Sequence, residues 1–224
     1  MDAVPAGFCV NSLQKHKWRS SGVATYIRRA YLGFAQTYSL PSMLSFVKKS
    51  QDLDFLTDNF SLIYAISVFT HLAENATAWL LELRRILADD GLLLVTFLGE
   101  GMIQQVIGES WDECRIGFNS VMYRNSWNNG GRMTFVSPWW IRARWGRTFE
   151  IVELRPYTAY GPDRKPAGQG LALLRKRPDN VSAKDIDRLE PGEPRELEAL
   201  QHNILQLRNE AATLRARISE LEKS

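Results

Sequence analysis

The chain has 224 residues, 45% of them hydrophobic and 24% charged, which is enough for one domain with a buried core and an appendage. The formal net charge of +3 is uneven, because residues 1–50 carry seven Lys or Arg residues and a single acid. We interpret these residues as a solvated basic face and expect no nucleic-acid partner, because nucleic-acid surfaces show tighter clustering of charge.

Neither the cysteines nor the apolar runs indicate an extracellular or membrane protein. Cys9 and Cys114 are far apart and have no metal-ligand spacing, so we expect a reducing environment and no metal centre. The N-terminus lacks the continuous apolar stretch of a secretory signal, and no apolar run approaches the roughly 20 residues that span a bilayer. These features predict a cytoplasmic protein without a membrane anchor.

The first 49 residues form an atypical N-terminal segment. Apolar residues recur at helical spacing in "GVATYIRRAYLGF", residues 22–34, which predicts one amphipathic helix there. The sequence on either side of this helix shows no clear period.

Residues 60–98 show the clearest pattern of the chain. "FSLIYAISVF" is almost continuously apolar, as is "LLLVTFL" further on, and both are typical of strands covered on both faces. Between them "ADDG" predicts a turn in which Gly91 takes a positive φ. The helix before this turn carries one apolar stripe, formed by Ala76, Trp79, Leu80, Leu83, Ile86 and Leu87. Strand, crossover helix and strand predict a right-handed βαβ unit.

The next part of the chain ends in two further strands. Residues 99–136 form a long connection without a clear period, rich in Trp, Asn and Gly. A helix is then predicted from Ser137, a capping residue followed by proline, to Gly146. Residues 149–157 and 170–177 read as strands, and the connection between them is too short for a crossover helix. We therefore expect these two strands to pair antiparallel.

The composition changes after Pro178. Residues 179–195 form a polar linker with several prolines, and residues 196–224 form a predicted coiled coil. Steps of three and four separate the apolar residues of its seam, which are Leu197, Leu200, Ile204, Leu207, Ala211, Leu214, Ile218 and Leu221. Isoleucine at a positions and leucine at d positions favour a parallel two-stranded dimer through residues 197–221. The alternative is a single amphipathic helix that folds back on the domain.

The pattern over residues 50–178 resembles a known enzyme family. "SVFTHL", a helix containing "WLLELRRIL", and an Asp-Gly turn into an apolar strand are similar to the fourth strand, helix and fifth strand of class I S-adenosylmethionine-dependent methyltransferases of a bacterial branch. "FVSPWWIRARWGRTFEIVELRPY" and "GLALLRKR" resemble the late helix and the last two strands of that family. The resemblance implies an α/β, Rossmann-like, mostly parallel sheet that ends in an antiparallel hairpin.

The resemblance also implies which residues form a site at the carboxyl ends of the parallel strands. It places Ser67, Val68 and Phe69 beside the methyl donor, S-adenosylmethionine. His71 is the candidate base, since a neutral imidazole can accept a proton near physiological pH, and the alternative is a structural histidine that caps the turn. The candidate acceptor-binding residues lie in the connection after the fifth strand and are Asp112, Glu113, Tyr123, Trp127 and Asn128.

The sequence departs from the family in its first third. The family holds its cofactor over a glycine-rich turn after the first strand and binds the ribose with an acid after the second. No glycine cluster occurs before residue 60, and if "YLGF" corresponds to the second strand, the acid position falls near Ala35 or Gln36. We therefore expect weak cofactor binding or none, and a truncated or frameshifted gene would explain the difference. The Asp/Asn-Pro-Pro-aromatic signature of DNA amino-methyltransferases is absent as well.

Two hypotheses of function follow. The first is an S-adenosylmethionine-dependent methyltransferase that acts on a small molecule or on a sugar or polysaccharide hydroxyl. The alternative is a catalytically inactive methyltransferase-like scaffold that dimerises through its coiled coil.

Overall fold

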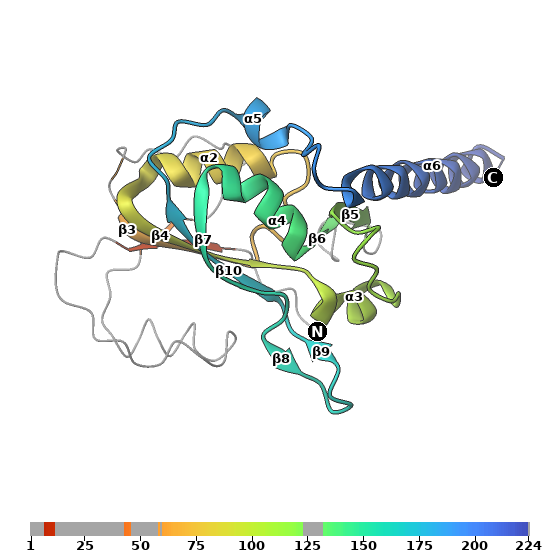
Figure 1. The fold of residues 1–224 in the computed structure, drawn as a ribbon. Coiled ribbons are helices and arrows are strands. Elements are labelled where there is room, and N and C mark those ends of the chain that lie inside the picture. Colours follow the sequence, from red (N-terminus) through yellow and green to blue (C-terminus); the bar gives the residue numbers. More distant parts are fainter. Residues whose placement is uncertain (1–6, 12–42, 46–57, 59, 123–131, 224) are drawn as a thin grey trace.

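A computed structural model describes residues 7–11, 43–45, 58, 60–122 and 132–223 of the chain. One mixed sheet forms its centre, with helices packed against it and a long C-terminal helix that projects away from it (Figure 1). The predicted helix at residues 22–34 lies outside the described residues, as do three candidate site residues, Tyr123, Trp127 and Asn128.

Six strands form the central sheet in the order β2-β1-β3-β4-β10-β7. Among the described pairs only β3 and β4 are parallel, whereas β1 pairs antiparallel with β2 and β3, and β10 pairs antiparallel with β4 and β7. The sheet is therefore mixed rather than mostly parallel. Its strands are β1 (Gly7–Asn11), β2 (Met43–Ser45), β3 (Phe60–Ile66), β4 (Leu87–Phe97), β7 (Phe149–Arg155) and β10 (Gly170–Lys176).

The predicted strand-helix-strand unit is confirmed by β3, α2 (Ala76–Ile86) and β4. All six residues of the predicted apolar stripe are buried, and Trp79, Leu80 and Leu83 lie in the main core. Burial of this stripe stabilises the helix, because an isolated helix of this length is marginal in water.

The turn after α2 differs from the expected one. β4 begins directly at Leu87, and "ADDG" forms an irregularity in its pairing with β3. Gly91 does not have the expected positive φ, since the described residues with positive φ do not include it. Glycine is required for space instead, because a Cβ there would lie 2.7 Å from Leu87 Cγ and 2.8 Å from the Ala88 carbonyl oxygen.

The predicted helix after Ser137 is confirmed as α4 (Pro138–Arg144), which continues into the 3-10 turn η2 (Trp145–Arg147). Ser137 caps the helix, because its hydroxyl accepts a hydrogen bond from the Trp140 backbone N–H at 3.4 Å. Trp145 is fully buried and joins the helix to the main core.

The predicted antiparallel pairing of the last two strands is confirmed. β10 runs beside β7 with Leu171 opposite Arg155 and Lys176 opposite Phe149. The connection between them forms a small hairpin of β8 (Ala159–Tyr160) and β9 (Pro166–Ala167), which extends beyond the sheet (Figure 1).

The long connection after β4 contains three elements that the sequence pattern did not indicate. These are α3 (Glu100–Ile107) and the antiparallel pair β5 (Phe118–Met122) and β6 (Arg132–Val136). They enclose a second, smaller apolar cluster of Leu98, Ile103, Ile116, Val121 and Phe135. β6 joins the end of β4, where the Val136 N–H donates to the Leu98 carbonyl oxygen at 2.8 Å.

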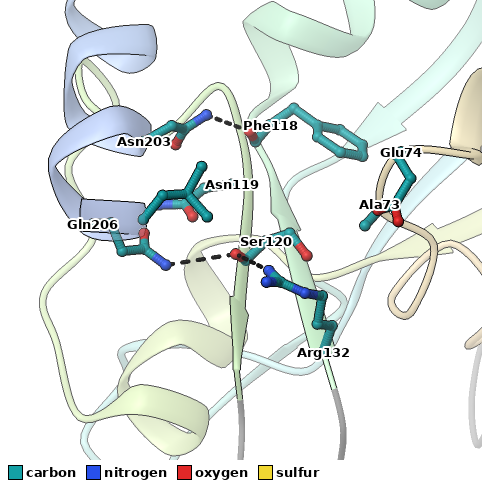
Figure 2. A pocket seen from close by; sticks show the side chains of 9 residues that line it. Ala73, Glu74, Phe118, Asn119, Ser120, Arg132, Asn203 and Gln206 are labelled. Atoms are coloured by element: carbon teal, nitrogen blue, oxygen red, sulfur yellow. Dashed lines mark hydrogen bonds between the residues drawn. The ribbon is translucent and has the colours of Figure 1, made fainter. Parts of the chain in front are cut away.

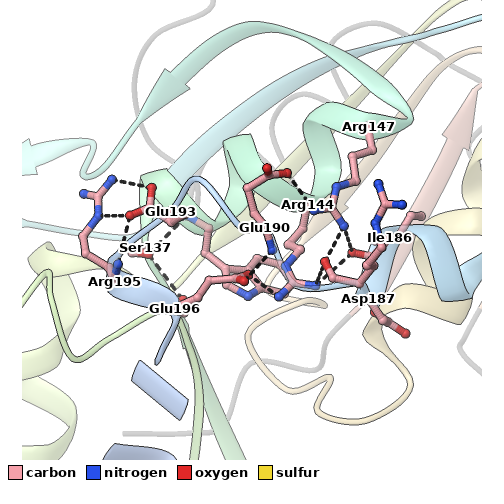
Figure 3. Close-up of polar contacts among 12 residues, drawn as sticks. Ser137, Arg144, Arg147, Ile186, Asp187, Glu190, Glu193, Arg195 and Glu196 are labelled. Carbon is pink, nitrogen blue, oxygen red and sulfur yellow. Dashed lines mark hydrogen bonds and ion pairs between the residues drawn. The ribbon is translucent and has the colours of Figure 1, made fainter. Parts of the chain in front are cut away.

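Residues 179–195, expected to be a polar linker, pack against the domain. They contain α5 (Ala183–Asp187), which begins with a capping box between Ser182 and Asp185, and Ile186 is fully buried. Arg147 donates to Glu190 at 2.9 Å, and this hydrogen bond lowers the pKa of the Glu190 carboxyl (Figure 3). Arg144 contacts the backbone of the same segment at the Ile186 carbonyl oxygen, at 3.3 Å.

The C-terminal helix α6 (Arg195–Leu221) has two different faces. Near its start Glu196 is buried against Arg144, and further along His202, Asn203 and Gln206 contact β5. Seven of the eight seam residues are between 41% and 68% exposed, and the eighth is Ala211. None of the described helices has the length and apolarity needed to cross a membrane.

Candidate functional site

The parallel strands β3 and β4 bring their carboxyl ends to one edge of the sheet, and the loop Ser67–His71 begins there. Ser67 has φ 56°, a left-handed conformation that is uncommon for a residue other than glycine. Its N–H donates to Thr96 Oγ1 at 2.8 Å, and its hydroxyl accepts from Gln169 Nε2 at 2.9 Å. The loop is thus held from β4 on one side and from the start of β10 on the other, which stabilises its strained backbone.

The next two residues of this loop belong to the core. Val68 and Phe69 are 2% and 1% exposed, and the Phe69 ring packs edge-on against Trp145 at a centroid distance of 5.2 Å. Their side chains are therefore committed to packing, which leaves their backbone groups as the part that a ligand at this edge could meet.

His71 is fixed by the strand β6. Its Nδ1 lies 3.1 Å from the Arg132 carbonyl oxygen, while the Thr134 N–H donates to the Thr70 carbonyl oxygen at 2.8 Å. Because a carbonyl oxygen can only accept, Nδ1 carries the proton and the lone pair of the neutral ring is on Nε2. This is the tautomer that a general base acting through Nε2 requires.

A polar cleft of about 320 Å³ lies beside this loop (Figure 2). Its walls come from residues 73 and 74 before α2, from β5 and β6, and from α6. Arg132 joins the cleft to the loop, because its side chain lines the cleft and its carbonyl oxygen holds His71. The lining residues of this polar cleft are Ala73, Glu74, Phe118, Asn119, Ser120, Arg132, Asn203, Gln206 and Leu207.

A second cavity of about 410 Å³ lies between α3, β5 and α6 and shares Asn119 and Gln206 with the polar cleft. Its lining residues include several apolar side chains, among them Ile103, Ile116 and Phe135. It borders the second apolar cluster, and none of its lining residues belongs to the loop Ser67–His71.

The two described acceptor candidates, Asp112 and Glu113, lie apart from both cavities. Asp112 accepts from the Cys114 N–H at 3.0 Å and pairs with Arg115 at 3.4 Å. Glu113 lies 3.4 Å from Arg195, and its carbonyl oxygen accepts from Trp139 Nε1. Both residues thus hold the turn before β5 and the start of α6, and the structure does not bring them together with His71.

The sequence did not indicate the residues that line the polar cleft. Arg132 and Ser120 lie in a stretch without periodicity, and Asn203 and Gln206 occupy polar positions of a heptad pattern, as any solvated face would show. The only available indication was the run of amide and imidazole side chains at His202, Asn203 and Gln206, which recur on one face of the tail helix.

The described residues do not fit the cofactor cradle of the family described above. In that family a glycine-rich turn follows the first strand, but β1, the first described strand of this chain, is antiparallel to β3, with Gly7 opposite Ile66, so it begins at the site edge instead of ending there. The glycines after β4 have a packing role, because a Cβ on Gly101 would lie 2.5 Å from the Gly168 carbonyl oxygen. Nor do the described residues contain a cluster of three His, Cys, Asp or Glu side chains that could hold a metal ion.

Similar solved structures are methyltransferases, at low identity. A methyltransferase from Methanosarcina mazei is 13% identical, with 58% of this chain and 65% of that chain covered at a TM-score of 0.40. The 1,6-didemethyltoxoflavin N1-methyltransferase of Burkholderia thailandensis, solved with its substrate and S-adenosylhomocysteine, is 16% identical, with coverages of 65% and 56% and a TM-score of 0.40. A glycopeptide N-methyltransferase in complex with S-adenosylhomocysteine is 12% identical, with coverages of 58% and 60% and a TM-score of 0.38.

The matched part of the chain thus spans less than two thirds of the length of these three proteins. No family model matches the sequence, and no curated protein sequence matches it.

Proposed function

We propose that the chain carries the acceptor side of an S-adenosylmethionine-dependent methyltransferase that acts on a hydroxyl of a small molecule or sugar. The observation that supports this most is the position of His71, held in one tautomer at the carboxyl end of β3 beside the polar cleft. The strand order β3-β4-β10-β7, with β10 antiparallel, agrees with the sequence resemblance of residues 50–178.

In this proposal the residues of the chain bind, orient and deprotonate the acceptor. Nε2 of His71 takes the proton of the acceptor hydroxyl, and the carbonyl oxygen of Arg132 holds the ring in place while it does so. The polar cleft positions the acceptor, and a fixed orientation of two reacting groups contributes substantially to rate.

A substitution of His71 separates the role of base from that of structural support. Asn in place of His71 retains a donor for the Arg132 carbonyl oxygen but has no titratable nitrogen. We expect His71→Asn to lower the rate of labelled methyl transfer to an acceptor hydroxyl by about 10²–10⁴-fold, while the free energy of unfolding changes little. Equal rates in the native chain and the variant would exclude His71 as the base.

The cofactor affinity of this chain is expected to be low. Loss of the glycine turn and the ribose acid removes several hydrogen bonds, each worth about 0.5–3 kcal/mol depending on charge. The loss of two or three such bonds weakens binding by ~100-fold or more. Isothermal titration with S-adenosylmethionine measures this directly, and a dissociation constant in the low micromolar range would contradict the expectation.

The second candidate function is a methyltransferase-like scaffold that dimerises through α6. The exposure of the seam favours it, since Leu197, Leu214 and Leu221 are 66%, 61% and 68% exposed in the single chain. A second copy of the helix, in parallel register, would cover this seam and bring Arg217 next to Glu222 of the other copy.

Sedimentation equilibrium of the full chain tests the dimer. Leu214→Asp places a charge in the seam and is expected to give a monomer at tens of micromolar protein. Thr213→Asp, one residue earlier and exposed but outside the seam, is the matched control and is expected to dimerise like the native chain. A native chain that is monomeric at this concentration would exclude the dimer.

A further inference from the structure

We propose that the polar cleft is a binding site for a sugar residue, either free or at the end of a glycan. The identification of this sugar as the methyl acceptor rests on the proposed function, whereas its binding does not. Four features of the cleft carry the inference: its balance of charge, its hydrogen-bonding groups, its apolar surface and the contribution of the tail helix.

The charges of the polar cleft disfavour small ions. Arg132 is its one cationic lining residue among those described, and Glu210 of α6 faces this guanidinium at 3.6 Å. Glu74 adds a second carboxylate on the opposite wall. A phosphate or carboxylate ligand would therefore meet more negative than positive charge, and a small cation would meet the guanidinium of Arg132.

The hydrogen-bonding groups of the cleft favour a ligand with several hydroxyls. One amide N–H of Asn203 donates to the Phe118 carbonyl oxygen at 2.9 Å, and Gln206 Nε2 donates to Glu210 at 3.0 Å and to the Ser120 carbonyl oxygen at 3.5 Å. Their amide oxygens, the amide oxygen of Asn119 and the carboxylate oxygens of Glu74 are acceptors, and Asn203 Oδ1 is buried without a hydrogen-bond partner among the described residues. A hydroxyl-rich ligand supplies the donors that such a lining requires.

The cleft also has apolar surface on two of its sides. Phe118, which Figure 2 shows, and Leu207 both line it. The Phe118 ring packs against Trp140 at a centroid distance of 4.8 Å. A sugar ring combines hydroxyls with a face of C–H groups, so it can satisfy the acceptors while its C–H face covers the aromatic ring. A polyamine or a simple polyol lacks one of these two properties.

The tail helix is part of this site. Asn203, Gln206 and Leu207 come from α6, more than 80 positions after the β5 residues that they face, such as Phe118 and Ser120. These contacts between α6 and β5 hold the α6 side of the cleft in place. Gln206 is therefore a specificity-determining residue of the cleft. The full chain, with its tail, is therefore required for binding.

Saturation-transfer NMR on the full chain without cofactor tests the proposal. The probes are D-glucose, D-galactose, D-mannose and L-rhamnose, together with their methyl glycosides, and the controls are spermidine and methyl phosphate, whose methyl protons report binding of a phosphate group. We expect at least one sugar to receive saturation and the two controls to receive none. Equal binding of a methyl glycoside would assign the site to the end of a glycan, and binding of the reducing sugar alone would assign it to a free sugar.

Matched variants place the bound sugar in the polar cleft. Gln206→Ala is expected to weaken sugar binding by about 3- to 10-fold, and Gln201→Ala, on the same helix but exposed and outside the cleft, is expected to leave it unchanged. Glu74→Ala, at an exposed position that poses no risk to folding, is expected to weaken binding as well.

Three results would overturn the proposal: no saturation of any sugar, equal affinities in Gln206→Ala and Gln201→Ala, or binding of spermidine or methyl phosphate in place of a sugar. A sugar that binds in the cleft but is never methylated would leave the site intact and refute the proposed function. Methyl transfer to an acceptor that does not bind in this cleft would support the proposed function and refute the proposal that the sugar bound in the cleft is the methyl acceptor.

Discussion

The buried ion pair between Arg144 and Glu196 connects the tail helix to the domain. Removing this ion pair tests how much it contributes to the stability of the folded chain. Both side chains are only 7% exposed. Glu196 also accepts from the Glu190 N–H at 2.6 Å, so one carboxylate joins α4, the segment before α6, and the first turn of α6 (Figure 3). Glu196→Ala leaves the Arg144 guanidinium buried without its carboxylate.

Removal of one partner of a buried ion pair costs about 3–5 kcal/mol of stability, because the remaining charge is not compensated. Arg144 keeps its hydrogen bonds to the carbonyl oxygens of Ile186 and Arg188, so the lower end of this range applies. We therefore expect Glu196→Ala to lower the free energy of unfolding by about 3 kcal/mol.

Glu198→Ala is the matched control, two positions further along the same helix. Glu198 is 51% exposed and lies 3.6 Å from Arg115, and such exposed pairs contribute less than about 1 kcal/mol. Urea unfolding followed by circular dichroism measures both variants. If Glu196→Ala and Glu198→Ala are destabilised equally, the ion pair does not fix the tail and the reasoning fails.

Two further predictions concern the start of β4 and the start of α5. Gly91→Ala should lower the free energy of unfolding by about 1–3 kcal/mol, because its Cβ would lie 2.7 Å from Leu87 Cγ. Gly146→Ala is the control and should not be destabilised, because its Cβ would meet nothing closer than 3.8 Å. Equal urea midpoints of the two variants would contradict the prediction. The hydrogen bond from Ser182 lowers the pKa of Asp185, so this carboxylate stabilises the fold above its unfolded pKa of about 4 and loses that contribution as the pH falls through the lowered value. Ser182→Ala should therefore be less stable than the native chain at pH 7, and this difference in stability should narrow below about pH 4. Ser182→Thr should behave like the native chain. A difference in stability between Ser182→Ala and the native chain that does not depend on pH would refute the role of Asp185.

Elements defined by local patterns were predictable from the sequence. The stripe from Ala76 to Ile86 is buried as one helical face, whereas Leu87, its last predicted residue, begins β4 instead. Ser137 followed by proline marks a helix start through local chemistry. The pairing of β7 with β10 followed from the length of their connection. The direction of β1 and the existence of the β5–β6 pair depend on contacts between distant segments, which no local period records.

The candidate site likewise combines residues whose position follows from a local pattern with residues brought there by contacts between distant segments. The position of Ser67 and His71 just after the carboxyl end of β3 was predictable, because the apolar run of β3 ends there, and their role in binding or catalysis stays a prediction. The polar cleft was not, because Arg132 reaches it from a stretch without periodicity and Gln206 from a helix whose heptads indicated a different role. The sequence did not indicate that residues 179–195 pack against the domain, because the buried Ile186 is one apolar residue in a mostly polar stretch.

The tail helix can wall the polar cleft and still offer its seam to a second copy. His202 lies about 160° around the helix axis from the seam residues Leu200 and Ile204, and Gln206 lies about 100° from Leu207, at 100° per residue. Leu207 belongs to both surfaces, because it is part of the seam and also lines the polar cleft. In a parallel pair each domain would thus stand to the side of the partner helix. Glu210 is already engaged by Arg132 and Gln206, so the pair expected between Glu210 and Arg215 of the other copy would compete with contacts inside the chain. The pair of Arg217 with Glu222 of the other copy would not. In such a dimer the register would therefore be set in the last two heptads.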